Sequence, residues 1–178
     1  MKKIIALIVA MLALSACSIQ GTWNIKSVTA QGCYSDSDCK PYFTIPGKDG
    51  GCDVTIAGTL TFSGESKGTL TEDLTMAVKC PGKQAFTRHF VVKDLKYRIF
   101  KSKGKTYIQE YKYNTVQQLS IGENALTRLA KTETNPVAAL SFAARGLKPP
   151  AYILLRYKYT RKAEEKARES GRSSLRDF

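Results

Sequence analysis

Apolar residues alternate with polar or small ones over several short segments of this chain. This alternation constrains the fold more than any other feature of the sequence. Between Val54 and Ser63, every second position belongs to one series: Val54, Ile56, Gly58, Leu60 and Phe62. Successive side chains of a β-strand point to opposite faces of a sheet, so this period of two predicts a strand with one buried face. A glycine-flanked turn at residues 64–68 leads into Thr69–Val78, and the two segments are predicted to form a hairpin.

Seven further segments are strand-like, because they alternate in the same way or are rich in β-branched and aromatic residues. They are Thr22–Ala30, Phe86–Val92, Leu95–Ile99, Tyr107–Tyr113, Val116–Ile121, Ala125–Lys131 and Tyr152–Thr160. Before the last of these, Asn135-Pro136 and Gly146 carry helix start and stop signals. We expect a helix over residues 136–145 whose apolar face, with Val137, Leu140 and Ala144, covers the outside of the sheet.

This order of elements predicts an all-β domain: an antiparallel barrel of eight strands, with one C-terminal helix and a following strand. Closing the sheet removes the two open edges that a flat sheet of this size would have. We place the barrel at residues 21–160 and a charged C-terminal tail at residues 161–178. A β-sandwich or another small-barrel fold is the alternative arrangement of the same strands.

The first sixteen residues have the three parts of a secretory signal. Lys2 and Lys3 precede an apolar run, Ile4–Leu14, which at eleven residues is shorter than the roughly 20 needed to span a bilayer. The run ends in Leu14-Ser15-Ala16-Cys17, which resembles the lipobox of bacterial lipoproteins. An ordinary signal peptide cleaved next to an incidental Cys17 is the alternative.

The resemblance implies that Cys17 becomes the first residue of the mature chain, with a diacylglycerol on its sulfur and an acyl group such as palmitate on its amine. More than one acyl chain anchors a protein stably. In such lipoproteins a serine after the lipidated cysteine, here Ser18, goes with the outer membrane. We therefore expect a lipid-anchored outer-membrane protein in which residues 17–20 are only a short tether to the barrel.

Four cysteines remain once Cys17 is lipidated. An even number in an exported chain predicts two disulfides, with three possible pairings. We favour Cys33 with Cys39, which closes a short polar loop, and Cys52 with Cys80, which pins a long loop to the barrel wall. Zinc is the alternative, but the cysteines are separated by 5, 12 and 27 residues and none forms a C-x-x-C pair. We expect no metal and no cofactor.

The chain is basic, with a net charge of +13 that becomes +11 once Lys2 and Lys3 are removed. An exported, lipid-anchored protein seldom meets nucleic acid, and the sequence contains no basic helix or aromatic RNA-binding motif. Anionic lipid head groups or an acidic partner are better candidates, and a basic surface that serves solubility is the alternative. The sequence does not indicate an oligomeric state.

Gly21-Thr22-Trp23 matches the G-x-W motif of lipocalins, and with the strand order it makes residues 20–160 resemble that family and its looser lipocalin-like relatives. The resemblance implies that the segment from Gln31 to Asp53 crosses the mouth of the barrel. It also implies that Trp23 closes the other end against an arginine, for which Arg128 is the first candidate and Arg156 the second. The family's T-D-Y motif is not matched, since Tyr113-Asn114-Thr115 stands near its place.

The resemblance to lipocalins further implies a small apolar ligand. Seven tyrosines fall on predicted strands, and we select Tyr97, Tyr107, Tyr111 and Tyr157 as candidates to line the cavity. The alternative is that tyrosines simply fill a small barrel. Another function is a protein–protein interaction through the Cys33–Cys52 loop. We expect no enzyme, because His89, the only histidine, reads as an ordinary strand residue and the chain has no G-x-S-x-G motif.

Overall fold

The computed structural model describes residues 18–144 and 146–162, so the leader and most of the C-terminal tail lie outside the described residues. Ten strands and one helix make up this part of the chain. They are β1 (Gly21–Cys33), β2 (Cys39–Ile45), β3 (Gly47–Asp49), β4 (Cys52–Phe62), β5 (Lys67–Lys79), β6 (Phe86–Ser102), β7 (Lys105–Glu110), β8 (Thr115–Ile121), β9 (Ala125–Glu133), α2 (Pro136–Ala143) and β10 (Tyr152–Arg161).

Eight of the strands form a closed antiparallel barrel. Each strand from β4 to β10 pairs with the next, and β1 pairs with both β10 and β4. The predicted closed barrel is therefore confirmed. Strands β2 and β3 lie outside the closed ring, where β2 extends the sheet from β1 and β3 extends it from β4.

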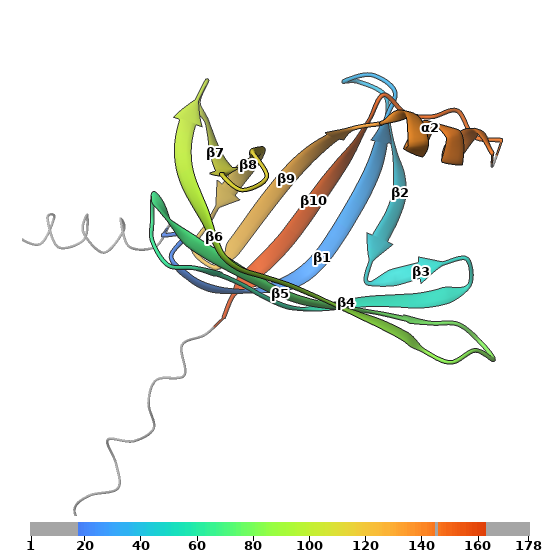
Figure 1. Ribbon diagram of the computed structural model, residues 1–178, viewed down its shortest axis with the longest axis horizontal. Helices are drawn as coiled ribbons and strands as arrows, with labels where there is room; N and C mark the ends of the chain where they lie inside the picture. Colours follow the sequence, from blue (N-terminus) through green and yellow to red (C-terminus); the bar gives the residue numbers. More distant parts are fainter. Residues whose placement is uncertain (1–17, 145, 163–178) are drawn as a thin grey trace, which may run out of the picture.

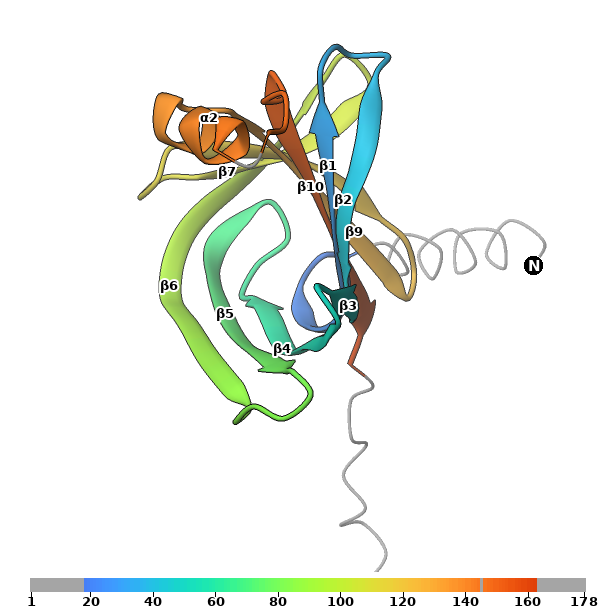
Figure 2. The same ribbon diagram turned by 90° about the vertical axis from the view of Figure 1, so that its right-hand side faces the viewer.

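The barrel is closed only near one end. β1 pairs with β4 over four residues, Gly21–Asn24, but with β10 over almost its whole length. Beyond that point the sheet divides into two walls, one built by β4, β5 and β6 and the other by β2, β1, β10 and β9 (Figure 1). Figure 2, turned by 90°, shows the first wall curving away from the second. The molecule thus has a closed end and an open end.

The buried core fills the closed end. Trp23, Leu60, Phe62 and Tyr97 are almost fully buried there, and the rings of Phe62 and Tyr97 meet edge to face at 5.3 Å. Ile19 belongs to the same core with 2% of its surface exposed, although it was predicted to be part of a tether. Burial of such large apolar side chains stabilises the closed end by roughly 1.5–3 kcal/mol for each of them.

Three predictions about the strands were wrong. The segments Phe86–Val92 and Leu95–Ile99 are one strand, β6, and not two. Lys93 and Asp94 do not reverse the chain but form a bulge, since the two of them face the single residue Thr71 of β5. Such a bulge bends the strand without ending it.

The second correction concerns the position of the last strand, β10, in the barrel. β10 was predicted to follow a complete eight-stranded barrel, but it is itself the eighth strand and pairs with β1 to close the ring. Helix α2 therefore lies in the connection between the seventh and eighth barrel strands. This order departs from the one that the resemblance to lipocalins implied.

The third correction concerns the long loop. The segment from Gln31 to Asp53 does not cross the mouth as a loop, because the end of β1, all of β2 and β3 and the start of β4 lie within it. Strand β1 continues to Cys33, nine residues beyond Asn24, the last residue that pairs with β4, and β2 folds back along it. The segment extends one wall of the open end instead of covering it.

Helix α2 does not pack its apolar face on the sheet as predicted. Val137 and Leu140 are 76% and 70% exposed. The helix lies beyond the ends of β9 and β10, where the ring of Phe142 stacks on that of Tyr42 in β2 at 5.4 Å (Figure 1). Its connection leaves at Gly146, whose φ of 69° suits a helix C-terminus.

Candidate ligand-binding site

The open end contains an apolar cavity of about 290 Å³ between β2, β3, β4 and β5. Its lining residues are Phe43, Thr44, Ile45, Asp49, Cys52, Val54, Met76 and Val78. This volume lies at the lower end of the range of about 300–1,000 Å³ that is usual for small-molecule sites. The cavity therefore suits one narrow apolar group.

Strand register explains why these side chains meet. Phe43 of β2 pairs with Ala30 of β1, and Ile45 pairs with Val28, so both take the inward face of that wall. On the other wall Val54 pairs with Val78 of β5. Residues that pair across antiparallel strands share a face, so the alternation of β4 and β5 presents an apolar series to the open end.

The apolar surface continues onto β6 beyond the cavity. Phe86 pairs with Val78 and Phe90 with Leu74, which puts both phenylalanines on the inner face. They are 58% and 41% exposed, and Phe43 on the facing wall is 40% exposed. A patch of several large apolar residues at the open end of a barrel is typical of a surface that binds something.

A buried charged cluster lies deeper in the barrel. Arg128 of β9 has 5% of its surface exposed, and its Nη2 donates to Oε1 of Glu110 at 2.7 Å. Its Nη1 reaches Oε1 of Glu72 at 3.4 Å and its Nε donates to Oε1 of Gln117 at 3.1 Å. Each side of the guanidinium thus has a partner, which a buried cation requires.

Two hydroxyl groups complete this charged cluster. Tyr159 donates to Oε1 of Glu72 at 3.2 Å, and Thr115 donates to Oε2 of Glu110 at 2.7 Å. The ring of Tyr157 lies 5.9 Å from the guanidinium carbon of Arg128. The two carboxylates outnumber the one cation, and the hydroxyl donors offset part of this excess negative charge.

The environment shifts the pKa values of the cluster in definite directions. Burial lowers the pKa of Arg128, but attraction by Tyr159, Glu72 and Glu110 outweighs it and raises that pKa above its ordinary value. Burial raises the pKa of Tyr159, and the opposing effect of Arg128 does not cancel it. The pKa of Tyr157 is raised for the same leading reason. At neutral pH the arginine is a cation and both phenols keep their protons.

The cluster and the cavity are separate but share one strand face. No member of the charged cluster around Arg128 is among the residues that line the cavity. On β5, however, Glu72 is followed at every second position by Leu74, Met76 and Val78, and the last two line the cavity. The inner face of β5 therefore runs from a polar floor, where the Glu72 side chain is 22% exposed, to an apolar mouth.

The arginine that packs on Trp23 is neither of the predicted candidates. Arg128 lies in the charged cluster and Arg156 is an exposed residue of β10. Arg161, the last residue of β10, pairs with Trp23, and its guanidinium carbon lies 4.2 Å from the centre of the indole ring. The indole Nε1 donates to the carbonyl of Ile19 at 2.8 Å. Gly21 stands at the start of β1 with a φ of 111°, beside the Arg161 side chain.

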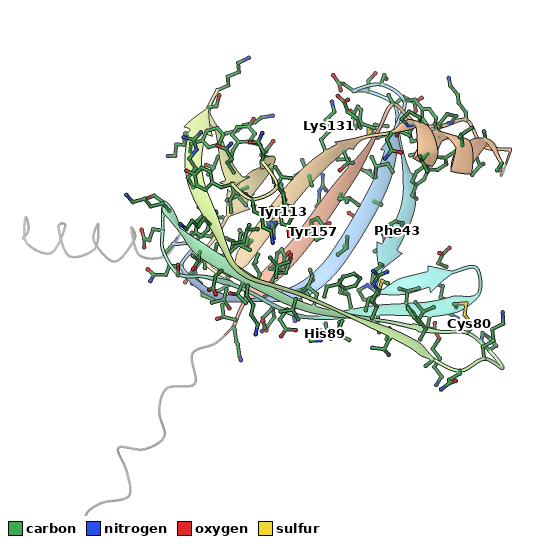
Figure 3. The ribbon with its side chains drawn as sticks, viewed as in Figure 1. Phe43, Cys80, His89, Tyr113, Lys131 and Tyr157 are labelled. Atoms are coloured by element: carbon green, nitrogen blue, oxygen red, sulfur yellow. A yellow bond between two sulfur atoms is a disulfide. The ribbon has the colours of Figure 1, made fainter. Side chains whose placement is uncertain are left out.

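The four selected tyrosines do not come together. Tyr97 is buried at the closed end, where its hydroxyl donates to the carbonyl of Gly64. Tyr107 stacks on Phe100 at 5.6 Å on the outer face of β6 and β7. Tyr111 is 53% exposed in the β7–β8 turn, so its placement on a strand was wrong. Tyr157 lies on the inner side of the sheet near the charged cluster (Figure 3).

The cysteines form two disulfides, Cys33–Cys39 and Cys52–Cys80, which is the pairing we favoured. The first closes the β1–β2 turn, and the second joins the start of β4 to the loop after β5. Cys52 also lines the cavity. Cys17 lies outside the described residues, as does the tail beyond Lys162.

His89 lies on the outer side of β6, away from the cavity and the charged cluster (Figure 3). Its Nε2 is 2.7 Å from Oδ1 of Asp73, and both side chains are more than half exposed. An exposed pair of this kind contributes at most about 1 kcal/mol to stability. Across residues 18–144 and 146–162, no group of three or more histidine, cysteine, aspartate and glutamate side chains is placed to hold a metal ion.

Several lining residues were not selected from the sequence. Phe43 and Ile45 fell in what was predicted to be a loop, so nothing assigned them a face. Val54, Met76 and Val78 fell on predicted strands, and their alternation is the signal that identifies the inner face. The alternation does not predict that the two walls of the sheet diverge at the open end, and this divergence is what leaves these residues uncovered.

Comparison with known proteins adds information about the N-terminus. Residues 1–18 match the family model of the prokaryotic membrane lipoprotein lipid attachment site. No curated protein and no solved structure matches the chain. None of the helices in the described part of the chain is long and apolar enough to cross a membrane. The attachment site supports lipid on Cys17, so the chain is a lipid-anchored, membrane-associated bacterial lipoprotein whose described part is a closed eight-stranded barrel.

Proposed function

We propose that this lipoprotein binds a small apolar ligand at the open end of its barrel and carries it within the cell envelope. The apolar cavity between β2 and the β4–β5 wall is the observation that carries the proposal. Its location agrees with the lipocalin-like mode of binding that the G-x-W motif implied, in which the ligand enters the open end. The proposal is non-enzymatic and assigns the protein no chemical change of its ligand.

The division of the barrel into a packed and an open half supports this function. The closed end leaves no route for a ligand, because Trp23, Leu60 and Phe62 have 1% or less of their surface exposed. A ligand would enter between the walls and lie along Val54, Met76 and Val78. Burying about 100 Å² of apolar ligand surface there contributes about 2.5 kcal/mol of hydrophobic stabilisation.

The proposed membrane is the outer one. The residue that follows the lipidated cysteine is Ser18, and serine at that place goes with outer-membrane sorting in the lipoproteins that the N-terminus resembles. Fractionation of the envelope tests this point, and recovery of the protein with the inner membrane would contradict it.

Mass spectrometry of lipid that co-purifies with the protein, followed by titration with a fluorescent fatty acid, tests ligand binding. Val54→Glu places a carboxylate in the apolar cavity, and we expect it to weaken fatty-acid binding at least tenfold, because an unpaired charge resists burial. Thr55→Glu is the matched control, since Thr55 is the exposed neighbour on the opposite face of β4. Equal binding by the two variants would contradict the proposed site.

An interaction with a second protein through the Cys33–Cys52 segment is the other candidate function. In the described part of the chain, β2 lies at an edge of the ten-stranded sheet and pairs with β1 alone, and such an edge accepts a further strand. Thr44→Pro removes a backbone N–H donor from this strand. If a partner protein adds a strand to β2, this substitution abolishes its binding, whereas Val54→Glu leaves that binding intact.

A further inference from the structure

The β6–β7 hairpin lies at the end of the barrel where the lipid is attached. Gln20, three residues after the lipidated cysteine, donates from Nε2 to the carbonyl of Ser63 in the β4–β5 turn at 3.4 Å. On the other side of that turn, the backbone N–H of Ile99 in β6 donates to the carbonyl of Ser66 at 2.6 Å. Beyond Ile99, β6 has therefore passed the β4–β5 turn, and its remaining residues project past it (Figure 1).

The tether between lipid and barrel has almost no length. Ile19 is buried in the core, and the carbonyl of Ser18 accepts a hydrogen bond from Nη2 of Arg161. Nη1 of Arg161 also donates to the carbonyl of Gln20 at 3.0 Å. Only the peptide unit between Cys17 and Ser18 separates the lipid from a fixed residue, and one such unit spans about 3.8 Å. The closed end is consequently held at the membrane surface.

The projecting hairpin is strongly basic. Between Arg98 and Tyr107 the sequence has four cations, Arg98, Lys101, Lys103 and Lys105, and no acidic residue. All four side chains are exposed. Within the described ranges, none of the three lysines has a carboxylate within salt-bridge distance. Their charge is available to an external anion.

An aromatic pair accompanies these cations. Phe100 and Tyr107 pair across the hairpin with ring centres 5.6 Å apart, and the guanidinium of Arg98 lies 5.5 Å from the Phe100 ring. Both rings are only half-buried although they lie outside the barrel. Aromatic rings beside lysines are characteristic of protein surfaces at the membrane–water interface.

We propose that the β6–β7 hairpin binds anionic phospholipid head groups of the leaflet that holds the lipid on Cys17. Lys101, Lys103 and Lys105 contact the phosphates, and the Phe100–Tyr107 pair lies at the head-group level. The hairpin is a second, electrostatic contact that fixes how the barrel stands on the membrane. It is independent of the ligand proposed for the open end.

Lysines at the other end of the barrel provide an internal control. Lys48, Lys79 and Lys83 are exposed and lie in or beside β3, the end of β5 and the β5–β6 loop. They belong to the open end, which the short tether holds away from the lipid. Any effect of an anionic membrane should therefore distinguish the two sets of three lysines.

Lysine labelling on the mature, lipidated chain tests the proposal. The protein is reconstituted into vesicles of phosphatidylcholine alone or of phosphatidylcholine with phosphatidylglycerol, treated with an amine-reactive reagent and mapped by mass spectrometry. We expect labelling of Lys101, Lys103 and Lys105 to fall by roughly fivefold each in the anionic vesicles. Labelling of Lys48, Lys79 and Lys83 should not change, and high salt should remove the protection because it screens surface charges.

Matched charge variants provide the second readout. In anionic vesicles we expect oxidative footprinting to find Phe100 and Tyr107 protected in the unsubstituted protein. Lys101→Gln, Lys103→Gln and Lys105→Gln together should remove that protection. Lys48→Gln, Lys79→Gln and Lys83→Gln, which lower the net charge equally, should retain it. Equal labelling of Lys101, Lys103 and Lys105 in both kinds of vesicle, or equal loss of protection in both variants, would overturn the proposal.

Discussion

Arg128 is the single residue on which the interior of the barrel depends most. It holds two carboxylates, Glu72 and Glu110, that the strand pattern points inward. Replacing a whole buried ion network by apolar residues is often harmless, whereas removing one partner leaves charges buried without compensation. Arg128 therefore stabilises the folded state mainly by preventing the free-energy cost of burying two carboxylates without a cation.

We expect Arg128→Met to lower the free energy of unfolding by about 3–5 kcal/mol, because both carboxylates then lack their cation. Urea denaturation followed by circular dichroism measures this change. Lys131→Met is the control, since Lys131 is more than half exposed and makes surface contacts with Asp36 at 3.9 Å and with the centre of the Tyr152 ring at 3.8 Å. Its loss should cost less than about 1 kcal/mol. Adding Glu72→Gln and Glu110→Gln to Arg128→Met should recover part of the stability, and a further loss would contradict this account.

Prediction from sequence was weakest at the residue scale. Trp23 was assigned to the closed end from its motif, and it lies there, but its arginine was sought at Arg128 or Arg156. The correct partner depends on the register between β1 and β10, which pairs Trp23 with Arg161. Register is fixed by pairing between strands that are far apart in the sequence. The alternation of apolar and polar residues alone does not show whether Arg128 or Arg161 lies beside Trp23. The tyrosines were grouped by residue type, and residue type does not specify a face.

At the scale of elements, Gly58 lies where the barrel opens. It lies next to Thr59, the last residue of β4 that pairs with β1. Its φ is 134°, and a Cβ at this position would come within 2.0 Å of the carbonyl oxygen of Asp73 in β5. Glycine is required both by the backbone conformation and by the close approach of the neighbouring strand.

We expect Gly58→Ala to destabilise the protein by about 2–4 kcal/mol, because the new methyl group strains β4 or separates it from β5. Thermal unfolding measures the change. Gly82→Ala is the matched control, since Gly82 also has a positive φ, of 68°, but nothing lies within 4 Å of its added Cβ. Equal losses in the two variants would show that backbone conformation alone matters and that the contact with β5 does not.

Strands were predicted well where one face is apolar along most of its length, as in β4 and β5. Prediction failed where a strand carries an irregularity. Lys93-Asp94 has the composition of a turn, and Asp94 does adopt a positive φ of 52°, yet the bulge it forms leaves β6 continuous. The helix was assigned a buried apolar face from its spacing, but no sheet surface lies beneath Val137 and Leu140. The local spacing of apolar residues predicts a helix or a strand, but it does not predict which other element packs against it.

At the scale of the whole molecule, buried phenols link stability to pH. Burial is the leading cause that raises the pKa values of Tyr97, Tyr157 and Tyr159 above 10.0. Below that pH the phenols are neutral in both the folded and the unfolded chain. Above it the unfolded chain releases protons that the folded protein retains, so the free energy of unfolding decreases as pH rises.

We expect urea midpoints to fall as the pH is raised from neutral to about 11, the alkaline side of the ordinary tyrosine pKa. Tyr159→Phe should give a flatter dependence, because it removes one of the protons involved, although it also removes the hydrogen bond to Glu72. Tyr113→Phe, which removes a phenol at an exposed position in the β7–β8 turn, is the matched control. An unaltered slope in Tyr159→Phe would contradict the linkage.

The hydrogen bond from Arg161 to the carbonyl of Ser18 also limits where the protein can act. A lipoprotein with a long flexible linker can move far from the membrane, but here the anchored end of the barrel stays at the bilayer surface. The open end stands above the membrane by no more than the length of the barrel itself. For the ligand proposed above, a donor or acceptor would have to come within that height. Exchange would then depend on lateral encounters between molecules that share the membrane or lie directly upon it.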